Sequence, residues 1–200
     1  NSRLTILIFA ATSFEIAPTL SFLEANFNET SEACFSKNES RIQVIITGVG
    51  LTVTAWNLAG AIHAANYQLA INAGVAGSFD RSLKLGAVVQ VRSEQFGDLG
   101  VEEADGRFTD VFEMGLQNDN QAPFINGVLH NPGAAESSFV AGVKGLTVNR
   151  VHGHEPSIKL IKKKYPDAQV ETMESAAFFY VCLSAGIAFI ALRGIYNYVE

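Results

Sequence analysis

Charged residues are scarce in this sequence. Asp, Glu, Lys and Arg make up 17% of its 200 residues, whereas 48% are hydrophobic; soluble domains usually contain about 25% charged residues. The 20 acidic residues outnumber the 14 basic ones, which gives a net charge of −6. A nucleic-acid-binding protein normally carries a basic face, so this balance argues against one. The most basic stretch, 162–164, is short, and we expect it to be a solvated helix end.

Cysteines and long hydrophobic runs are scarce as well. The two cysteines, Cys34 and Cys182, cannot form a disulfide framework or a closed zinc site. Their neighbours are apolar, so we expect two buried thiols. The early apolar run at 4–11 has eight residues, whereas a membrane-spanning helix needs about twenty. Glu15 follows that run too closely for a secretion signal. We therefore expect a cytoplasmic protein that binds neither membranes nor nucleic acid.

Apolar runs of strand length alternate with helical patterns along the whole chain. This alternation, together with the low charge, predicts one domain with a three-layer α/β/α sandwich around a central mixed sheet. Residues 94–140 have weak periodicity, and we expect long loops with short strands there. The expected strands are 4–10, 33–36, 41–47, 68–72, 87–92, 143–151, 169–171 and 187–195, and the expected helices are 14–25, 51–65, 156–165 and 172–185.

The turn between the first expected strand and helix carries Glu15. Functional crevices of open α/β sheets lie beyond the carboxyl ends of the strands, so this carboxylate could act as a general base. Thr12 and Glu15 also have the spacing of a capping box, and spacing alone favours capping. Both roles are compatible only if Glu15 is not folded back onto the helix start.

Two glycine-bearing segments follow strands. Gly48-Val49-Gly50 comes after strand 41–47, and residues 72–77, with the sequence NAGVAG, follow strand 68–72. In such turns bare backbone amides can approach a ligand's oxygens. Neither segment completes a dinucleotide fingerprint, since Val53 stands where a third glycine or alanine is needed. Simple tight turns remain an equal alternative.

Further candidates lie in the last third of the chain. Glu174 falls in the first turn of helix 172–185, where it would either favour the helix dipole or accept hydrogen bonds from vicinal hydroxyls. Arg193 closes a very apolar strand, so we expect it to have an anionic partner. His152, His154 and Glu155 are too few ligands for a good zinc site, and we expect no metal.

Eight blocks of the sequence, in this order, resemble the nucleoside phosphorylase/nucleosidase superfamily, and within it the futalosine hydrolases most closely. Each block is weak alone, but the ordered set is specific and covers nearly the whole chain. The blocks are ATSFEIAP (11–18), TGVGL (47–51), NAGVAGSFD (72–80), FGDLGVE (96–102), TVN (147–149), VHG (151–153), VETMESAAFFY (170–180) and NYVE (197–200).

The resemblance implies an enzyme that hydrolyses the N-glycosidic bond of futalosine to hypoxanthine and dehypoxanthine futalosine in menaquinone biosynthesis, without metal or organic cofactor. By position, Glu15 matches the carboxylate that deprotonates water, Glu174 the residue that grips the ribose hydroxyls, and Arg193 a side chain near the water. Asn197 matches a purine-facing aspartate of methylthioadenosine/S-adenosylhomocysteine nucleosidases. The implied substrate contacts are Gly50, Val75, Ala76, Gly77, Val151, His152, Thr172 and Met173.

Two details favour a futalosine hydrolase over its relatives. An amide at Asn197 can donate to the N7 and O6 acceptors of a 6-oxopurine, whereas an aspartate suits a 6-aminopurine. The 11–15 loop has no cation that would hold phosphate, which favours hydrolysis over phosphorolysis. The alternatives are a methylthioadenosine/S-adenosylhomocysteine or aminofutalosine nucleosidase, and a nucleoside-binding module without turnover.

The resemblance also has departures and implies an assembly. Tyr196 stands where the family usually has a small residue, Ser175 where glycine is commoner, and Val75 where the methylthioadenosine relatives have serine. The family continues past Glu200 with a loop and a helix, so we expect a missing C-terminal element. It also forms homodimers or larger homo-oligomers, and we expect residues 94–140 to make such a contact around a small-molecule nucleoside site.

Overall fold

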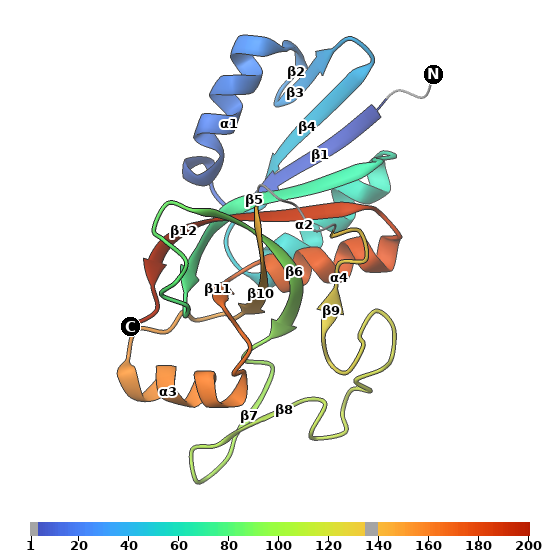
Figure 1. The fold of residues 1–200 in the computed structure, drawn as a ribbon. Helices are drawn as coiled ribbons and strands as arrows, with labels where there is room; N and C mark the ends of the chain where they lie inside the picture. Colours follow the sequence, from blue (N-terminus) through green and yellow to red (C-terminus); the bar gives the residue numbers. More distant parts are fainter. Residues whose placement is uncertain (1–3, 135–139) are drawn as a thin grey trace.

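The structure, a computed structural model, describes residues 4–134 and 140–200 (Figure 1). Strands and helices alternate, as the sequence predicts. In chain order the elements are β1 (Leu4–Ala10), α1 (Ser13–Asn26), β2 (Asn28–Ser31), β3 (Cys34–Lys37), β4 (Ser40–Ile46), α2 (Leu51–Ala64), β5 (Leu69–Ser78), β6 (Val88–Phe96), β7 (Gly100–Glu102), β8 (Phe108–Asp110), β9 (Leu129–His130), β10 (Ala141–Thr147), α3 (Glu155–Lys164), β11 (Val170–Thr172), α4 (Ser175–Ala185) and β12 (Phe189–Tyr198).

The described residues form a ten-stranded mixed sheet in the order β11-β10-β6-β12-β5-β1-β4-β3-β2, with β9 added to β6. β1, β4, β5 and β12 pair in parallel, whereas β12 is antiparallel to β6. β11 also pairs with β5, so this end of the sheet curls back on itself. The predicted mixed α/β class is confirmed, and the curl brings β11 beside β5.

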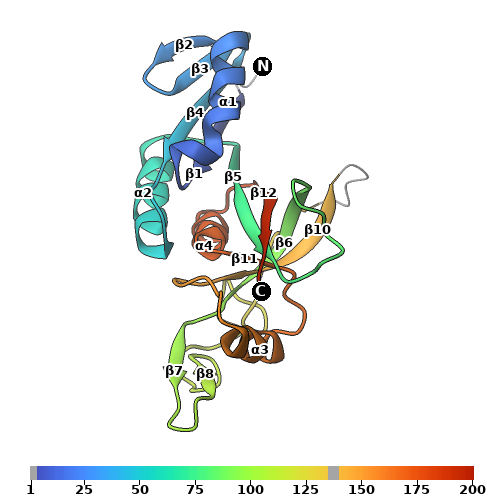
Figure 2. The same ribbon diagram turned by 90° about the vertical axis from the view of Figure 1, so that its left-hand side faces the viewer.

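Alternate residues of β1 show how the layers are built. Leu7 and Phe9 pack with α2 and α4 on one face, whereas Ile8 and Ala10 pack with α1 on the other. α2 and α4 lie next to each other on their face (Figure 2). Each buried Leu or Phe of these cores stabilises the fold by about 1.5–3 kcal/mol. The helices therefore cover both faces, as a three-layer sandwich requires.

Several predicted boundaries are wrong, and β5 is the informative case. The glycines at 74 and 77 do not form a turn; they continue β5 to Ser78 alongside β12. A Cβ on Gly77 would lie 2.9 Å from Val199 Cγ2, so glycine serves close strand approach there. Sequence periodicity does not separate that use of glycine from a turn.

Other elements differ less from their predictions. Strand β2 was not predicted, since its residues, NETS, are polar and all exposed. Strand β10 ends at Thr147 instead of 151, and α4 begins at Ser175 instead of 172. The basic run at 162–164 ends α3 as expected, but Lys164 is not simply solvated. It pairs with Asp110 at 2.9 Å and with Glu113, which ties α3 to the segment after β8.

Two smaller expectations concern cysteine and the membrane. Cys34 and Cys182 are buried free thiols, as predicted. Within residues 4–134 and 140–200, no helix has the length and apolar character needed to cross a bilayer.

Candidate active site

The turn between β1 and α1 holds Glu15 in two ways. Its Oε2 accepts hydrogen bonds from Thr12 N at 3.1 Å and Thr12 Oγ1 at 3.0 Å, which closes the capping box. Its Oε1 accepts from Val75 N at 3.1 Å. The condition that a catalytic Glu15 stay clear of the helix start is therefore not met. The cap uses only one of the two carboxylate oxygens, however, and Oε1 has a second lone pair for another donor.

Val75 N–H reaches Glu15 because β5 is longer than its neighbour β1. The two strands pair only as far as Phe9 opposite Asn72, whereas β5 continues to Ser78 along β12. Between Asn72 and Gly77, where β11 begins to pair, this edge of β5 has no partner strand among the described residues, and Val75 donates to the Glu15 carboxylate from it. Strand geometry thus fixes where the carboxylate lies.

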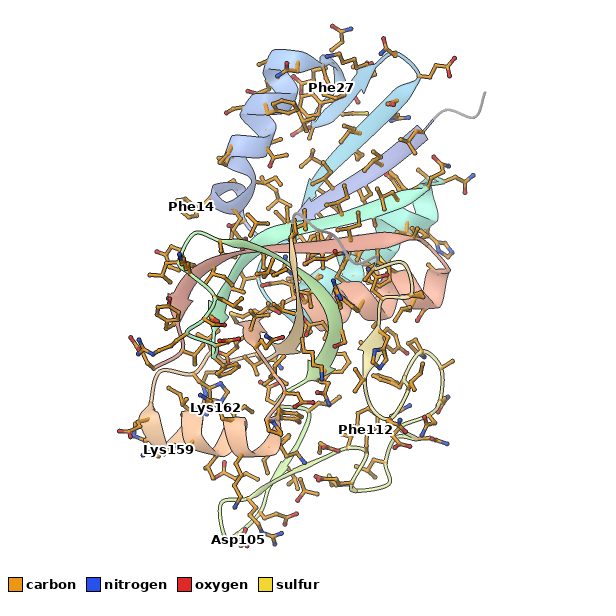
Figure 3. All side chains as sticks on the ribbon, in the orientation of Figure 1. Phe14, Phe27, Asp105, Phe112, Lys159 and Lys162 are labelled. Atoms are coloured by element: carbon orange, nitrogen blue, oxygen red, sulfur yellow. The ribbon has the colours of Figure 1, made fainter. Side chains whose placement is uncertain are left out.

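Gly74 lies beneath the gap between Glu15 and Arg193. A Cβ built on Gly74 would be 3.0 Å from Glu15 Oε1 and 3.1 Å from Arg193 Nη1. A carboxylate and a guanidinium that the sequence places 178 positions apart therefore converge on one point. Phe14, beside Glu15, projects outward at the same end of α1 and is 77% exposed (Figure 3).

Replacing Gly74 with alanine is expected to lower kcat by up to about 10²-fold, because the methyl group would push Glu15 or Arg193 aside, and displacements near 1 Å can cost that much. Steady-state kinetics on a purine nucleoside would measure it. The matched control is Gly60→Ala on the exposed face of α2, where a Cβ meets nothing within 4 Å. Equal kinetics for both variants would contradict this placement.

Arg193 is the buried charge of the site. It is 2% exposed, and its Nη2 donates to Ser175 Oγ at 2.6 Å and to Asn72 Oδ1. Desolvation lowers the pKa of this guanidinium, whereas Glu94, Glu174 and Glu15 act in the opposite direction. Among the described residues, Arg193 therefore makes no direct ion pair with the anionic partner that was expected. Neutral oxygens accept its hydrogen bonds, and three acidic side chains lie near it.

Glu174 reaches across the site to Gly50. It is the N-cap residue of α4 but makes no side-chain cap bond; its Oε1 accepts from Gly50 N at 2.9 Å. Gly50 has φ of 101°, which favours glycine. Burial raises the pKa of the Glu174 carboxyl, and the Gly50 bond and Arg193 oppose that shift. The helix-dipole interpretation of Glu174 is thus replaced by a specific contact.

The glycine segments use their amides differently from the prediction. The N–H groups of Gly50 and Val75 are not bare, because each donates to a carboxylate of the site. The segments therefore orient Glu174 and Glu15. Contact of Gly50, Val75, Ala76 and Gly77 with a ligand stays a prediction; Ala76 is buried, and Val75 is exposed.

His152 and Glu171 form a pair that the sequence did not reveal. The buried Glu171 carboxylate accepts from His152 N at 3.0 Å and lies against His152 Nδ1. One carboxylate thus fixes both the backbone and the ring of His152. Val151 beside it is exposed. Purine contact by Val151 and His152 stays a prediction.

Asn197 lies next to Gly77 and close to this pair. Its amide atoms are 3.5 and 3.6 Å from the position of a Gly77 Cβ, and Asn197 Nδ2 donates to Tyr198 O at 2.9 Å. Gly77 pairs with Asn197 on one side and with Glu171 on the other. The strand register is shifted at Tyr196, which is 67% exposed. Asn197 and the His152–Glu171 pair therefore lie on opposite sides of the C-terminal end of β5.

The model of the phosphorylase superfamily matches residues 5–200. The chain belongs to this superfamily. That result confirms the membership predicted from the ordered motifs.

Two curated relatives are futalosine hydrolases, in agreement with the closest resemblance seen in the sequence. The protein of Streptomyces coelicolor is 27% identical over 134 residues, which cover 66% of this chain and 54% of that one. The protein of Acidothermus cellulolyticus is 26% identical over 195 residues, which cover 96% and 79%. The match thus spans about half the length of the first relative.

Solved structures of the superfamily share the fold. The 5'-methylthioadenosine/S-adenosylhomocysteine nucleosidase of Helicobacter pylori, crystallised with a nucleoside analogue, has a TM-score of 0.78 at 18% identity, covering 100% of this chain and 88% of that one. The futalosine hydrolase of the same species has a TM-score of 0.77 at 19% identity, covering 99% and 86%. At these identities the likeness shows the superfamily fold.

Sequence reasoning missed the polar residues beneath the site. Glu94, Thr147 and Ser175 are fully buried, and Asn72 is nearly so. Thr172, predicted as a substrate contact, lies among them on β11, and its hydroxyl is 3.0 Å from Thr147 Oγ1. Met173, the next residue, is partly exposed. A charged residue inside an apolar strand, as Glu94 is in β6, was the available signal.

No group of metal-ligating side chains is found in the part of the chain that the structure describes. Of the three residues weighed for zinc, His152 binds Glu171, and Glu155 pairs with Lys159 at 2.6 Å on the exposed side of α3.

Proposed function

We propose that the chain is a nucleosidase that hydrolyses the N-glycosidic bond of futalosine and releases hypoxanthine. The observation that carries this proposal is the convergence of Glu15 Oε1 and Arg193 Nη1 above Gly74, with the Glu174 carboxylate fixed nearby on Gly50. A site with two carboxylates and one buried cation suits a reaction that builds positive charge on a sugar and uses water as nucleophile.

The roles of the residues follow from the charges that develop. Glu15 Oε1 takes a proton from water, and the water oxygen bonds to C1′ of the ribose. The C1′–N bond breaks, and its electron pair leaves with the base, which takes a proton from solvent while Glu15 returns its own proton to solvent. Glu174 accepts from the ribose hydroxyls while Gly50 N–H holds its Oε1. Arg193 Nη1 orients the water, and Met173 contacts the ribose face.

Hydrolysis is favoured over phosphorolysis by the charge beside the nucleophile. Residues 11–15 contain no cation, and Glu15 would repel a phosphate dianion. Arg193 is already committed to Ser175 and Asn72. Adding inorganic phosphate is therefore expected to leave turnover unchanged and to give no sugar phosphate.

The deciding assay incubates the chain with futalosine and measures hypoxanthine release. Methylthioadenosine and S-adenosylhomocysteine are competing substrates, because a curated relative and a solved structure with the same fold are nucleosidases named for them. Aminofutalosine, a 6-aminopurine analogue of futalosine, is the third. Faster release of adenine than of hypoxanthine would overturn the assignment of substrate. Tight binding without release of any base would instead indicate a nucleoside-binding module.

Replacing Asn197 with aspartate is expected to shift the preference toward 6-aminopurines, because one amide hydrogen bonds to Tyr198 O and the other can donate to a 6-oxopurine. A misplaced hydrogen bond of this kind changes discrimination by about 1–3 kcal/mol, roughly 5- to 150-fold. Ratios of kcat/KM for inosine and adenosine nucleosides would measure it. The same change at the exposed Asn26 is the control. Unchanged ratios would place base recognition elsewhere.

The proposed function also includes a cellular location, a pathway and an assembly. The chain acts in the cytoplasm, in menaquinone synthesis, as a homodimer or larger homo-oligomer. The proposed contact is residues 94–140, of which 135–139 lie outside the described residues; Val101, Met114 and Leu116 leave large apolar side chains exposed there. Size-exclusion chromatography with light scattering would determine the assembly.

A further inference from the structure

Glu94 is a fully buried acid for which the proposed chemistry has no use. It lies on β6 at 0% exposure, and its Oε2 accepts from Thr147 Oγ1 at 2.9 Å. Its Oε1 has no hydrogen-bond partner among the described residues. A Cβ on Gly145 would collide with Oε1, so the glycine in β10 makes room for the carboxyl group. A buried, half-satisfied carboxyl is costly, which raises the question of what it does.

The hydroxyl of Thr147 connects Glu94 to the start of α4. Thr147 Oγ1 donates to Glu94, accepts from Ala176 N at 2.9 Å, and lies 3.0 Å from Thr172 Oγ1. Because the one Thr147 hydrogen goes to Glu94, Thr172 must donate to Thr147. Thr172 Oγ1 can then accept from Ser175 N, 3.3 Å away. Because Thr147 donates to Glu94 Oε2, every bond in this chain has a fixed direction.

These hydrogen bonds help to position two candidate catalytic residues, Glu174 and Arg193. It satisfies the first N–H groups of α4, which have no partner inside a helix, and so fixes the residue before the helix, Glu174. Ser175 Oγ accepts from Arg193 Nη2 at 2.6 Å, and the same hydroxyl lies near Glu94. Glu94 is also one of the acidic groups near the buried Arg193 and acts against the lowering of its pKa.

We propose that Glu94 is a positioning residue. Through Thr147 it orients the hydroxyls that hold the start of α4 and, with it, Glu174. Beside Ser175 it also helps to place the Arg193 guanidinium. The kinetic part of its test rests on the proposed nucleosidase function. Burial raises the pKa of the Glu94 carboxyl to about 8, against the opposing effects of Thr147 and Arg193.

The test compares Thr147→Val, which keeps the shape and removes the hydroxyl, with Thr147→Ser, which keeps the hydroxyl. We expect Thr147→Val and Glu94→Gln each to lower kcat by up to about 10-fold, as loss or misorientation of a buried hydrogen bond does. Thr147→Ser should keep most of the wild-type kcat, although it loses a methyl group from the core. If only packing mattered, valine would be the better replacement, so a more active valine variant would overturn the proposal.

The double variant Glu94→Gln, Thr147→Val shows whether the two residues act together or independently. In the Glu94→Gln background Thr147→Val should lower kcat and Tm by less than it does in the wild type, since the effects of residues in one network are not additive. Multiplying effects would overturn the proposal. Glu39→Gln, exposed in the turn before β4, is the control for the charge change.

Thermal unfolding gives a readout that needs no activity. A carboxyl whose pKa is raised on folding contributes stability below its unfolded pKa and loses it as pH rises through the folded value. The Tm of the wild type should therefore fall relative to Glu94→Gln between about pH 4.5 and pH 8. If the wild type releases no base from any nucleoside, the proposed function fails, while non-additivity in Tm and this pH dependence still test Glu94. Parallel Tm profiles together with additive Tm losses in the double variant would overturn the proposal.

Discussion

Replacing Glu15 with glutamine is expected to lower kcat by about 10²–10⁴-fold, the usual cost of removing a general base. Glutamine keeps the size of the side chain and an oxygen that can accept from Thr12 or Val75 N–H. It cannot take a proton from water. Release of hypoxanthine from futalosine, followed by chromatography under single-turnover conditions, would measure the change in the chemical step.

The control for this variant is on the same helix. Glu24→Gln removes one exposed carboxylate from α1 without approaching the site, so its kcat should equal that of the wild type. Thermal unfolding of both variants would show how much of any loss reflects the capping box, whose removal costs about 1 kcal/mol. A Glu15→Gln enzyme within threefold of wild-type kcat would mean that the carboxylate serves only the cap.

Replacing Glu174 with glutamine is expected to lower kcat by about 10²–10³-fold. The negative charge that would stabilise the developing positive ribose is lost, and removal of one preorganised electrostatic contact has effects of this size. An amide can still accept from Gly50 N, so the loop at 48–50 should stay in place. Pre-steady-state kinetics would measure the rate of bond cleavage, and titration with a stable nucleoside analogue would measure binding.

A helix-start acid elsewhere in the chain provides the matched control. Glu155 is in the first turn of α3, is exposed, and pairs only with Lys159 at 2.6 Å among the described residues. Glu155→Gln should therefore lose the helix-dipole contribution without a kinetic effect. Similar losses from both variants would return Glu174 to the helix-dipole role first weighed for it.

The sequence predicted the fold and the members of the site better than it predicted their contacts. Periodicity placed most strands and helices, because buried strands and amphipathic helices have distinct spacings. The motifs identified Glu15, Arg193 and Glu174, which the structure brings together at the strand ends. Their catalytic roles stay predictions.

What the sequence could not provide depends on residues distant along the chain. Gly50 lies 124 positions from Glu174, and Val75 lies 60 positions from Glu15. No local pattern indicates that a backbone N–H will be taken by a distant carboxylate. Glu171 was expected at the end of a short strand, but only the pairing of β11 with β10 and β5 shows it buried beneath His152.

Because β5 extends past the end of β1, the backbone donor of the site and the side chain that it binds come from different elements, and each can change without the other. The Val75 N–H belongs to the strand, whereas the carboxylate to which it donates, Glu15, comes from the first turn of α1. A different turn could present a cation there and leave the same N–H to a phosphate oxygen, with no change to the sheet. A change of nucleophile from water to phosphate would then require exchange of only a few turn residues, with the sheet unchanged.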